Sequence, residues 1–157
     1  MITVRRARTS DVKPIREIVD AYSAGRRLLK KETVTLYEQT QEFVVAEKNG
    51  QVVGCGALHI LWEDLAEVRT VAVFPEFKGK GYGSLLLEAL INRANQLGVK
   101  RIFCLTFETK FFTKHGFTEI KGTPVEPEIY QQLLESYDVG VAEFLDLDKV
   151  KYLKPGI

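Results

Sequence analysis

The sequence predicts a single α/β (α+β) domain over residues 1–157, with helices on the faces of a mixed sheet. Three observations support this fold class. A length of 157 residues suits one substantial hydrophobic core. Hydrophobic residues make up 45% and charged residues 27%, as in a folded globular chain. Strand-like and helix-like segments also alternate along the chain without an internal repeat.

The first half of the chain contains β-prone runs separated by two helical segments. Thr9, Ser10 and Asp11 are helix-capping residue types, and apolar residues recur at helical spacing after them. Asn49-Gly50, between two apolar runs, predicts a hairpin turn. The predicted elements are a strand at Thr3–Arg6, a helix running to Ala24, a helix at Thr33–Gln41, and strands at Phe43–Glu47, Val52–Leu61 and Glu67–Val73.

The second half contains the clearest helix, Gly83–Leu97, which has one apolar face and ends at Gly98. After it the sequence predicts a strand at Arg101–Thr106, a helix at Lys110–His115, a strand at Phe117–Ile120, a helix at Glu128–Tyr137 and a final strand at Val141–Leu147. An exposed final strand could support a homodimer.

Charge and cysteine usage exclude several classes of function. Lys and Arg total 22 against 21 Asp and Glu, so nucleic-acid binding is not expected. Cys55 and Cys104 lie in apolar runs, without zinc spacing, and predict reduced, buried thiols and no metal. The N-terminal residues lack an apolar signal core, and no apolar run is long enough for a membrane span. The sequence therefore predicts a cytoplasmic protein.

The segment with the most chemical information is a strand, a glycine-containing loop and the long helix. Glycines allow close backbone approach, and a helix N-terminus favours negative charge, so this order predicts a diphosphate site. It differs from a P-loop because Gly81 follows Lys80, and its glycine spacing is not that of a dinucleotide fingerprint. The predicted binding residues are Lys78, Gly79, Lys80, Gly81, Tyr82, Gly83 and Ser84.

These residues resemble the acetyl-CoA motif of the GNAT acetyltransferase superfamily. Glu67, Ala72, Val73, Pro75, Gly81 and Gly83 fit its strand and loop pattern, whereas Lys78 replaces the usual Arg or Gln; the segment Phe111–Phe117 resembles a second family motif. The resemblance implies the GNAT fold: a twisted, mixed, mostly antiparallel sheet of six to seven strands, flanked by helices and splayed at the acetyl-CoA site. It also implies that the pantetheine arm pairs with the backbone of Val71, Ala72 and Val73, and that Phe112 contributes to the cofactor site.

A narrower resemblance is to the acetyltransferase domain of N-acetylglutamate synthases. It is carried by Leu28–Lys31, Glu67–Val73, Leu105–Phe107 and Phe112–Thr118. The sequence departs from those enzymes at Ala66, at the Lys30-Lys31 pair and in the spacing after Thr106. The resemblance implies a small-molecule amino-acid acceptor bound near Lys30, Lys31, Val68, Arg69 and Thr70.

The resemblance also implies the catalytic residues. Glu67 is the candidate general base for the acceptor ammonium; the alternative is a surface carboxylate paired with Arg69. The tyrosine that often serves the family as general acid is replaced by Phe112, so Thr106 is a substitute candidate, although a hydroxyl satisfied within its strand is the plainer interpretation.

The leading hypothesis is transfer of acetyl from acetyl-CoA to the α-amine of L-glutamate in a ternary complex, the first step of arginine biosynthesis. Four alternatives stay open: L-glutamine as the acceptor, another small amine, a protein N-terminus or lysine, and a non-catalytic acetyl-CoA sensor.

Overall fold

The computed structural model describes residues 1–23, 33–105, 109–122, 125–136 and 150–155. The chain forms two compact units, which are described separately below. The first comprises Met1–His59 and Val68–Arg93, and the second comprises Ile60–Glu67 and Ala94–Ile157.

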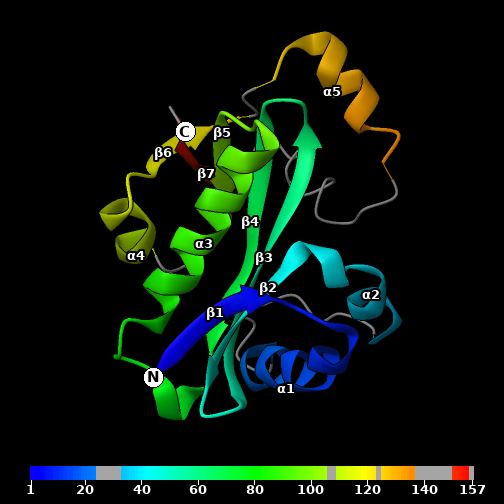
Figure 1. Ribbon diagram of the computed structural model, residues 1–157. Coiled ribbons are helices and arrows are strands. Elements are labelled where there is room, and N and C mark those ends of the chain that lie inside the picture. Colours follow the sequence, from blue (N-terminus) through cyan, green and yellow to red (C-terminus); the bar gives the residue numbers. More distant parts are fainter. Residues whose placement is uncertain (24–32, 106–108, 123–124, 137–149, 156–157) are drawn as a thin grey trace. The chain divides into compact units, whose positions relative to one another are not determined.

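The strands form a seven-stranded mixed sheet in the order β1-β2-β3-β4-β5-β7-β6, which confirms the predicted fold class (Figure 1). Strands β4 and β5 pair in parallel, and the pairs β1–β2, β2–β3, β5–β7 and β6–β7 are antiparallel. The strands are β1 (Ile2–Arg6), β2 (Phe43–Lys48), β3 (Gln51–Trp62), β4 (Leu65–Val73), β5 (Arg101–Cys104), β6 (Thr118–Lys121) and β7 (Val150–Lys154); the α-helices are α1 (Val12–Ser23), α2 (Thr33–Glu38), α3 (Tyr82–Leu97), α4 (Thr109–Lys114) and α5 (Pro127–Leu133).

The hairpin between β2 and β3 forms as predicted at Asn49 and Gly50. Their φ values are 53° and 79°, so both central residues are left-handed, as a type I′ turn requires. The register shifts between Ala46 and Glu47, which pair with Gly54 and Val52, so Val53 of β3 is the extra residue of a β-bulge. The Asn49-Gly50 turn therefore determines how β2 connects to β3, and the bulge shifts the pairing of the two strands farther from the turn.

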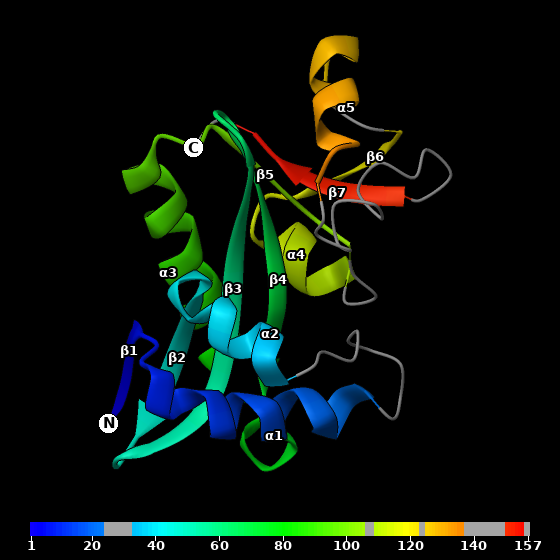
Figure 2. The same ribbon diagram turned by 90° about the vertical axis from the view of Figure 1, so that its right-hand side faces the viewer.

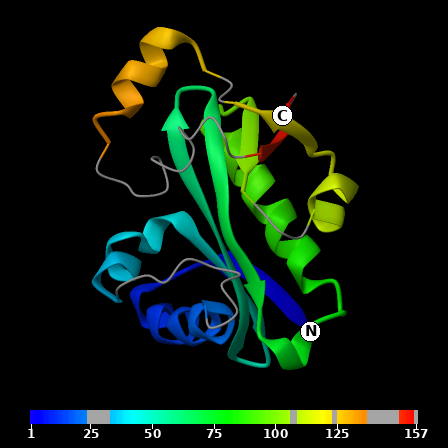
Figure 3. The same cartoon turned by 180° about the vertical axis from the view of Figure 1, so that it is seen from behind.

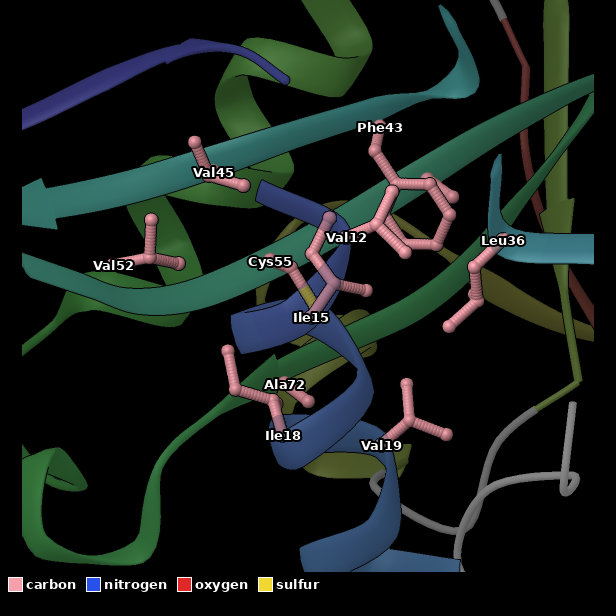
Figure 4. Close-up of a cluster of buried hydrophobic side chains, with 11 residues drawn as sticks. Val12, Ile15, Ile18, Val19, Leu36, Phe43, Val45, Val52, Cys55 and Ala72 are labelled. Carbon is pink, nitrogen blue, oxygen red and sulfur yellow. The ribbon is translucent and has the colours of Figure 1, made fainter. Parts of the chain in front are cut away.

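One core of the first unit lies between α1, α2 and the strands (Figure 4). Ile15, Ile18 and Val19 project from α1, and Leu36 projects from α2, toward residues of β2, β3 and β4. Full burial of each such aliphatic side chain stabilises the fold by roughly 1.5–3 kcal/mol. The buried members are Val12, Ile15, Ile18, Val19, Leu36, Phe43, Val45, Val52, Cys55, Ala57 and Ala72.

Helix α3 packs closely on β3 because two positions of the strand lack a side chain (Figure 3). A Cβ atom on Gly54 would lie 3.0 Å from Leu86 Cδ1 and 3.1 Å from the carbonyl oxygen of Ala72. A Cβ atom on Gly56 would lie 3.0 Å from Leu90 Cδ1. Leu86 and Leu90 are fully buried, so these glycines fix the position of the first part of α3.

The second unit is built on the start of β4, on β5, and on β7 with β6 beside it (Figure 2). Its core contains Leu61, Leu65, Phe103 and Leu133, with half-buried residues of α5 and β7 packed against them. β7 was not predicted from the sequence. The predicted strand at Val141–Leu147 lies outside the described residues.

Other elements differ from the prediction mainly at their ends. Helix α2 ends at Glu38, and a short 3-10 helix covers Thr40–Glu42 where the prediction continued one helix. β4 begins at Leu65, two residues earlier than predicted, because β3 and β4 are joined by a tight turn at 63–64. No helix within the described ranges has the length and apolar character that crossing a membrane requires.

The start of α1 is held by an ion pair that gives a stability prediction. Asp11 accepts hydrogen bonds from the Arg5 guanidinium at 2.8 Å and from the Arg8 backbone N–H at 2.7 Å. These contacts, chiefly that with Arg5, hold the pKa of the Asp11 carboxyl below its usual value although burial opposes them. A depressed folded-state pKa contributes stability above the unfolded pKa of about 4, and this contribution is lost as pH falls through the folded value.

Asp11→Asn is therefore expected to lower the free energy of unfolding by about 2 kcal/mol at pH 7, and by much less at pH 3. Urea denaturation at both pH values measures the difference. Asp20→Asn is the matched control, because Asp20 pairs with Arg16 at 3.2 Å on the surface and should cost under about 0.5 kcal/mol. An equal loss of unfolding free energy at pH 3 and pH 7 would show that the contribution of Asp11 does not depend on its ionisation.

Candidate functional site

Strand β4 changes its backbone conformation at Thr70. The φ of Thr70 is 57°, a left-handed value that is an outlier for a β-branched residue. Such strain persists only where the surrounding structure fixes it, and it is concentrated at functional sites. The parallel pairing of β4 with β5 covers Leu65–Glu67, whereas β4 continues to Val73. The left-handed residue therefore lies in the second half of β4, beyond the stretch that pairs with β5.

The last three residues of β4 use their side chains for packing. Ala72 belongs to the core cluster beneath α1. Val71 Cγ2 lies 3.5 Å from the position that a Cβ atom on Gly56 would take, and Val73 Cγ2 lies 3.2 Å from the position that a Cβ atom on Gly54 would take. Both valine side chains are therefore on the side where α3 packs. Because the side chains of Val71–Val73 are used in packing, these residues can offer only backbone N–H and C=O groups to an extended ligand.

The connection after β4 is anchored at its beginning. The Phe74 N–H donates to the Val53 carbonyl oxygen at 2.9 Å, and the Tyr22 hydroxyl donates to the Val73 carbonyl oxygen. Lys78 Nζ lies 5.2 Å from the centroid of the Tyr22 ring. Tyr22 thus links α1 to both the end of β4 and the first lysine of the loop, a role that the sequence did not indicate.

Two glycines give the loop its form. Gly79 and Gly81 have φ values of 79° and 82°, and a Cβ atom on either would meet no atom within 4 Å. Glycine is therefore favoured at both positions by the positive φ and not by a lack of space for a side chain. The space beside the backbone is open to a ligand. Exposed Lys78 and Lys80 alternate with these glycines.

Helix α3 begins directly after the loop. The Leu85 N–H donates to the Gly81 carbonyl oxygen at 3.3 Å, which places Gly81 at the N-cap position. The N–H groups at Tyr82 and Gly83 then have no carbonyl partner within the helix, and they lie at its positive end. Lys48 Nζ lies 6.0 Å from the Tyr82 ring centroid and adds a cation to this surface. Backbone N–H groups, a helix N-terminus and lysines together can bind phosphate groups.

Glu67 is a buried carboxylate. Glu67 is only 5% exposed, so it is not a surface carboxylate. The pKa of the neighbouring Cys104 thiol is raised by burial and, to a smaller extent, by the charge of Glu67. Cys104 is therefore held as a neutral thiol and is not an activated nucleophile.

The remaining predicted residues are distributed differently. Phe112 is 6% exposed and packs edge-to-face with Phe111 at 5.1 Å and Phe117 at 5.2 Å, within an aromatic cluster of the second unit. Val68 is buried, and Arg69 and Thr70 are half-buried. Thr106, Lys30 and Lys31 lie outside the described residues.

Two features of the second unit were not found from the sequence. An open hollow is lined by Trp62, Asp64, Arg101, Val125 and Ile129, together with Glu63, Gly98, Lys100 and Glu126, and it includes none of the predicted site residues. Lys151 on β7 is 0% exposed. Its burial could not be predicted because β7 itself was missed. No cluster of three or more metal-ligating side chains occurs among the described residues.

Comparison with known proteins adds independent information. Residues 12–117 match the model of the acetyltransferase (GNAT) family. A Mycobacterium tuberculosis protein named amino-acid acetyltransferase is 57% identical over 157 residues, covering 98% of this chain and 88% of that protein. An amino-acid acetyltransferase from Pasteurella multocida is 31% identical over 126 residues, which are 78% of this chain but 29% of that longer protein.

Two solved structures extend the comparison. A Mycobacterium tuberculosis protein in complex with CoA and NLQ superposes with a TM-score of 0.94 and 52% identity, covering 99% of both chains. An N-acetylglutamate synthase from Neisseria gonorrhoeae, complexed with coenzyme A and N-acetyl-glutamate, gives a TM-score of 0.81 at 22% identity. That match covers 100% of this chain and 35% of the synthase, and it shows the shared fold.

Proposed function

The chain belongs to the acetyltransferase (GNAT) family, and from that premise we propose that it transfers the acetyl group of acetyl-CoA to the α-amine of L-glutamate. The observation that carries the proposal is the order of features along β4 and its continuation. A buried carboxylate, Glu67, is followed by the left-handed residue Thr70, by a left-handed glycine loop and by a helix N-terminus. The relative that is 57% identical, named amino-acid acetyltransferase, supports an amino acid as the acceptor.

The cofactor site in this proposal uses backbone groups of the first unit. Val71, Ala72 and Val73 pair with the pantetheine arm, in the manner of a strand added to a sheet edge. The N–H groups from Gly79 to Ser84 bind the pyrophosphate, and Lys78 and Lys80 supply positive charge. Phe112 is a further cofactor contact in this proposal. The open space beside Gly79 and Gly81 supports this assignment.

Acetyl-CoA supplies an activated thioester, and the chain's own residues prepare the amine. An α-ammonium group must lose a proton before its nitrogen can attack, and Glu67 takes that proton directly or through water. Thr106 remains the candidate proton donor to the leaving thiolate. The acceptor is held by Lys30, Lys31, Val68, Arg69 and Thr70, where the cations pair with its carboxylates.

The acceptor is tested by thiol detection of CoA released from acetyl-CoA in the presence of each of the twenty amino acids. We expect turnover with glutamate well above that with other amino acids. Preference for glutamine would keep the reaction and change the acceptor. Tight acetyl-CoA binding without turnover of any amino acid would overturn the proposal, and peptide substrates would then separate a protein acetyltransferase from a sensor.

Three broader points belong to the same proposal. The buried thiols of Cys55 and Cys104, which are not oxidised to disulfides, support a reducing, cytoplasmic location. Residues 1–157 fold as one domain, which a single cooperative unfolding transition would support. A homodimer is checked by sedimentation at several protein concentrations.

A further inference from the structure

The inference concerns Tyr22, which lies in the last turn of α1 and contacts both the end of β4 and the start of the glycine loop. Its half-buried ring packs against the core cluster beneath α1. Its hydroxyl donates to the Val73 carbonyl oxygen, and Lys78 Nζ lies 5.2 Å from its ring centroid. These residues all belong to the first unit. Phenylalanine would fill the same apolar space, so packing alone does not explain the hydroxyl.

The peptide group between Val73 and Phe74 is held at both ends. The Phe74 N–H donates to the Val53 carbonyl oxygen on β3 at 2.9 Å. In a planar trans peptide the C=O points away from the N–H of the same group, so the Val73 carbonyl points away from β3. The Tyr22 hydroxyl donates to it on that side. The hydroxyl therefore lies at the edge of β4 that is opposite β3.

The residues before Val73 show which backbone groups share this edge. The Ala72 carbonyl oxygen lies 3.1 Å from the position that a Cβ atom on Gly54 of β3 would take, so it points toward β3. Backbone groups of successive strand residues point to opposite edges. Val71 and Val73 therefore present their N–H and C=O groups on the other edge, where β5 follows β4 in the sheet order. The pairing of β4 with β5 covers Leu65–Glu67, so Val71 and Val73 lie beyond it.

Tyr22 determines where this edge ends as a pairing surface. An extended ligand beside β4 pairs with the backbone groups of residues that are two apart. The Val73 carbonyl already accepts the Tyr22 hydroxyl, and the N–H of Phe74 is directed to β3. The Val73 N–H is therefore the last group that continues a pairing begun at Val71.

The ring of Tyr22 also holds a cation. Lys78 is exposed and directly precedes Gly79, and its ammonium group lies within the distance of about 6 Å over which an aromatic face attracts a cation. A lysine side chain loses rotamer freedom when it binds a phosphate, and a side chain already held by a ring loses less. The residue that ends the pairing edge therefore also prepares a donor to phosphate oxygens.

We propose that Tyr22 is a positioning residue for acetyl-CoA, placed where the pantetheine arm ends and the diphosphate begins. Its hydroxyl fixes the Val73 carbonyl and so sets the last backbone group that pairs with the arm. Its ring holds the Lys78 ammonium group for the diphosphate oxygens. The inference rests on the proposed function for the cofactor and is independent of which amine accepts the acetyl group.

The other lysines of this surface have different places. Lys48 Nζ lies 5.8 Å from the centroid of the Phe77 ring and 6.0 Å from that of the Tyr82 ring, and these two residues flank the glycine loop in the sequence. Lys80 lies within the loop and is exposed. Lys48 thus braces the loop from β2, whereas Tyr22 joins the start of the loop to β4.

The first test is binding of CoA, by calorimetric titration, to Tyr22→Phe and Lys78→Met. We expect the Kd to rise at least about threefold in Tyr22→Phe and at least about fivefold in Lys78→Met, since the second change removes a charged donor. The matched controls are Tyr37→Phe, at a tyrosine that is 44% exposed on α2, and Lys13→Met, at an exposed lysine of α1. Both should stay within about twofold of the wild type. An unchanged Kd in Tyr22→Phe overturns the proposal, even if that variant is less stable to denaturant.

Pantetheine separates the two roles of Tyr22, because it lacks the diphosphate and the nucleotide. Its affinity is measured by displacement of bound CoA. Tyr22→Phe should weaken pantetheine by the same factor as CoA, whereas Lys78→Met should leave pantetheine within about twofold of the wild type. An arm contact that Tyr22 does not set would leave pantetheine unchanged in Tyr22→Phe, and equal losses of CoA and pantetheine affinity in Lys78→Met would overturn the assignment of Lys78 to the diphosphate.

A double-variant cycle tests whether the ring holds the lysine. In a Tyr22→Leu background, Lys78→Met should raise the Kd for CoA by a factor at least about twofold smaller than in the wild type. Additive losses overturn the contribution of the ring, and the Tyr22→Phe result stands if Tyr22→Leu does not fold. If CoA binding responds as expected while no amino acid is acetylated, the role of Tyr22 stands and the proposed acceptor fails. A wild-type chain that does not bind CoA overturns both.

Discussion

Replacing Glu67 with glutamine is expected to lower kcat for amino-acid acetylation by about 10²–10⁴-fold, the usual contribution of a general base. Glutamine keeps the size and most hydrogen-bonding capacity of the side chain but cannot accept the proton. Because the residue is 5% exposed, solvent should not easily replace it. Thiol release at saturating acetyl-CoA measures kcat, and calorimetric titration should give an unchanged affinity for acetyl-CoA.

Glu63→Gln provides the matched control for that experiment. Glu63 lies four residues earlier, in the turn between β3 and β4, and its side chain is exposed. Its replacement should leave kcat within about twofold, as expected of a surface change remote from the site. If Glu67→Gln retained more than about a third of wild-type kcat, Glu67 would not be the base, and its burial would need a structural explanation.

Gly81→Val is expected to raise the Kd for acetyl-CoA by at least about tenfold. The φ of Gly81 is 82°, and a β-branched residue resists that value, so the loop should rearrange or carry strain of about 1–3 kcal/mol. Since Gly81 immediately precedes α3, rearrangement would also redirect the first N–H groups of the helix. Equilibrium titration with acetyl-CoA measures the effect, and desulfo-CoA serves as a non-reacting ligand.

Gly98→Val separates ligand binding from backbone strain in this comparison. Gly98 has a φ of 89°, and a Cβ atom there would also meet nothing within 4 Å, but it follows the C-terminal end of α3. The two variants should therefore lose similar stability to denaturant, whereas only Gly81→Val should weaken acetyl-CoA binding. If the two variants bound acetyl-CoA with equal affinity, the glycine loop would not be part of the cofactor site.

The parts of the fold that were predicted depend on neighbours in the sequence. Asn49-Gly50 specifies its own turn, and the leucine spacing of α3 specifies its buried face because helical periodicity is local. The strand–loop–helix order also identified the candidate phosphate site, since glycine conformations and a helix N-terminus act within a few residues. The resemblance in the motifs added Glu67, whose side-chain type alone does not distinguish a base from a surface charge.

The parts that were missed depend on contacts between distant segments. The left-handed conformation of Thr70 contradicts the preference of threonine and must be imposed by tertiary packing. Tyr22 reads as one more apolar position of α1, and its hydroxyl bond to Val73 spans 51 residues. Lys151 alternates with Val150 and Tyr152 near the chain terminus, and only the pairing of β7 with β5 and β6 brings its side chain into the interior.

The burial of both cysteines gives the protein an internal reporter of its own integrity. Cys55 is 0% exposed and Cys104 is 1% exposed, so aromatic disulfide reagents should not reach either sulfur while the chain is folded. In a colorimetric assay the native enzyme then adds no background to the signal from liberated CoA. Upon unfolding, two thiols become titratable per chain, and the rate at which they appear in the absence of substrate measures how often the native packing opens.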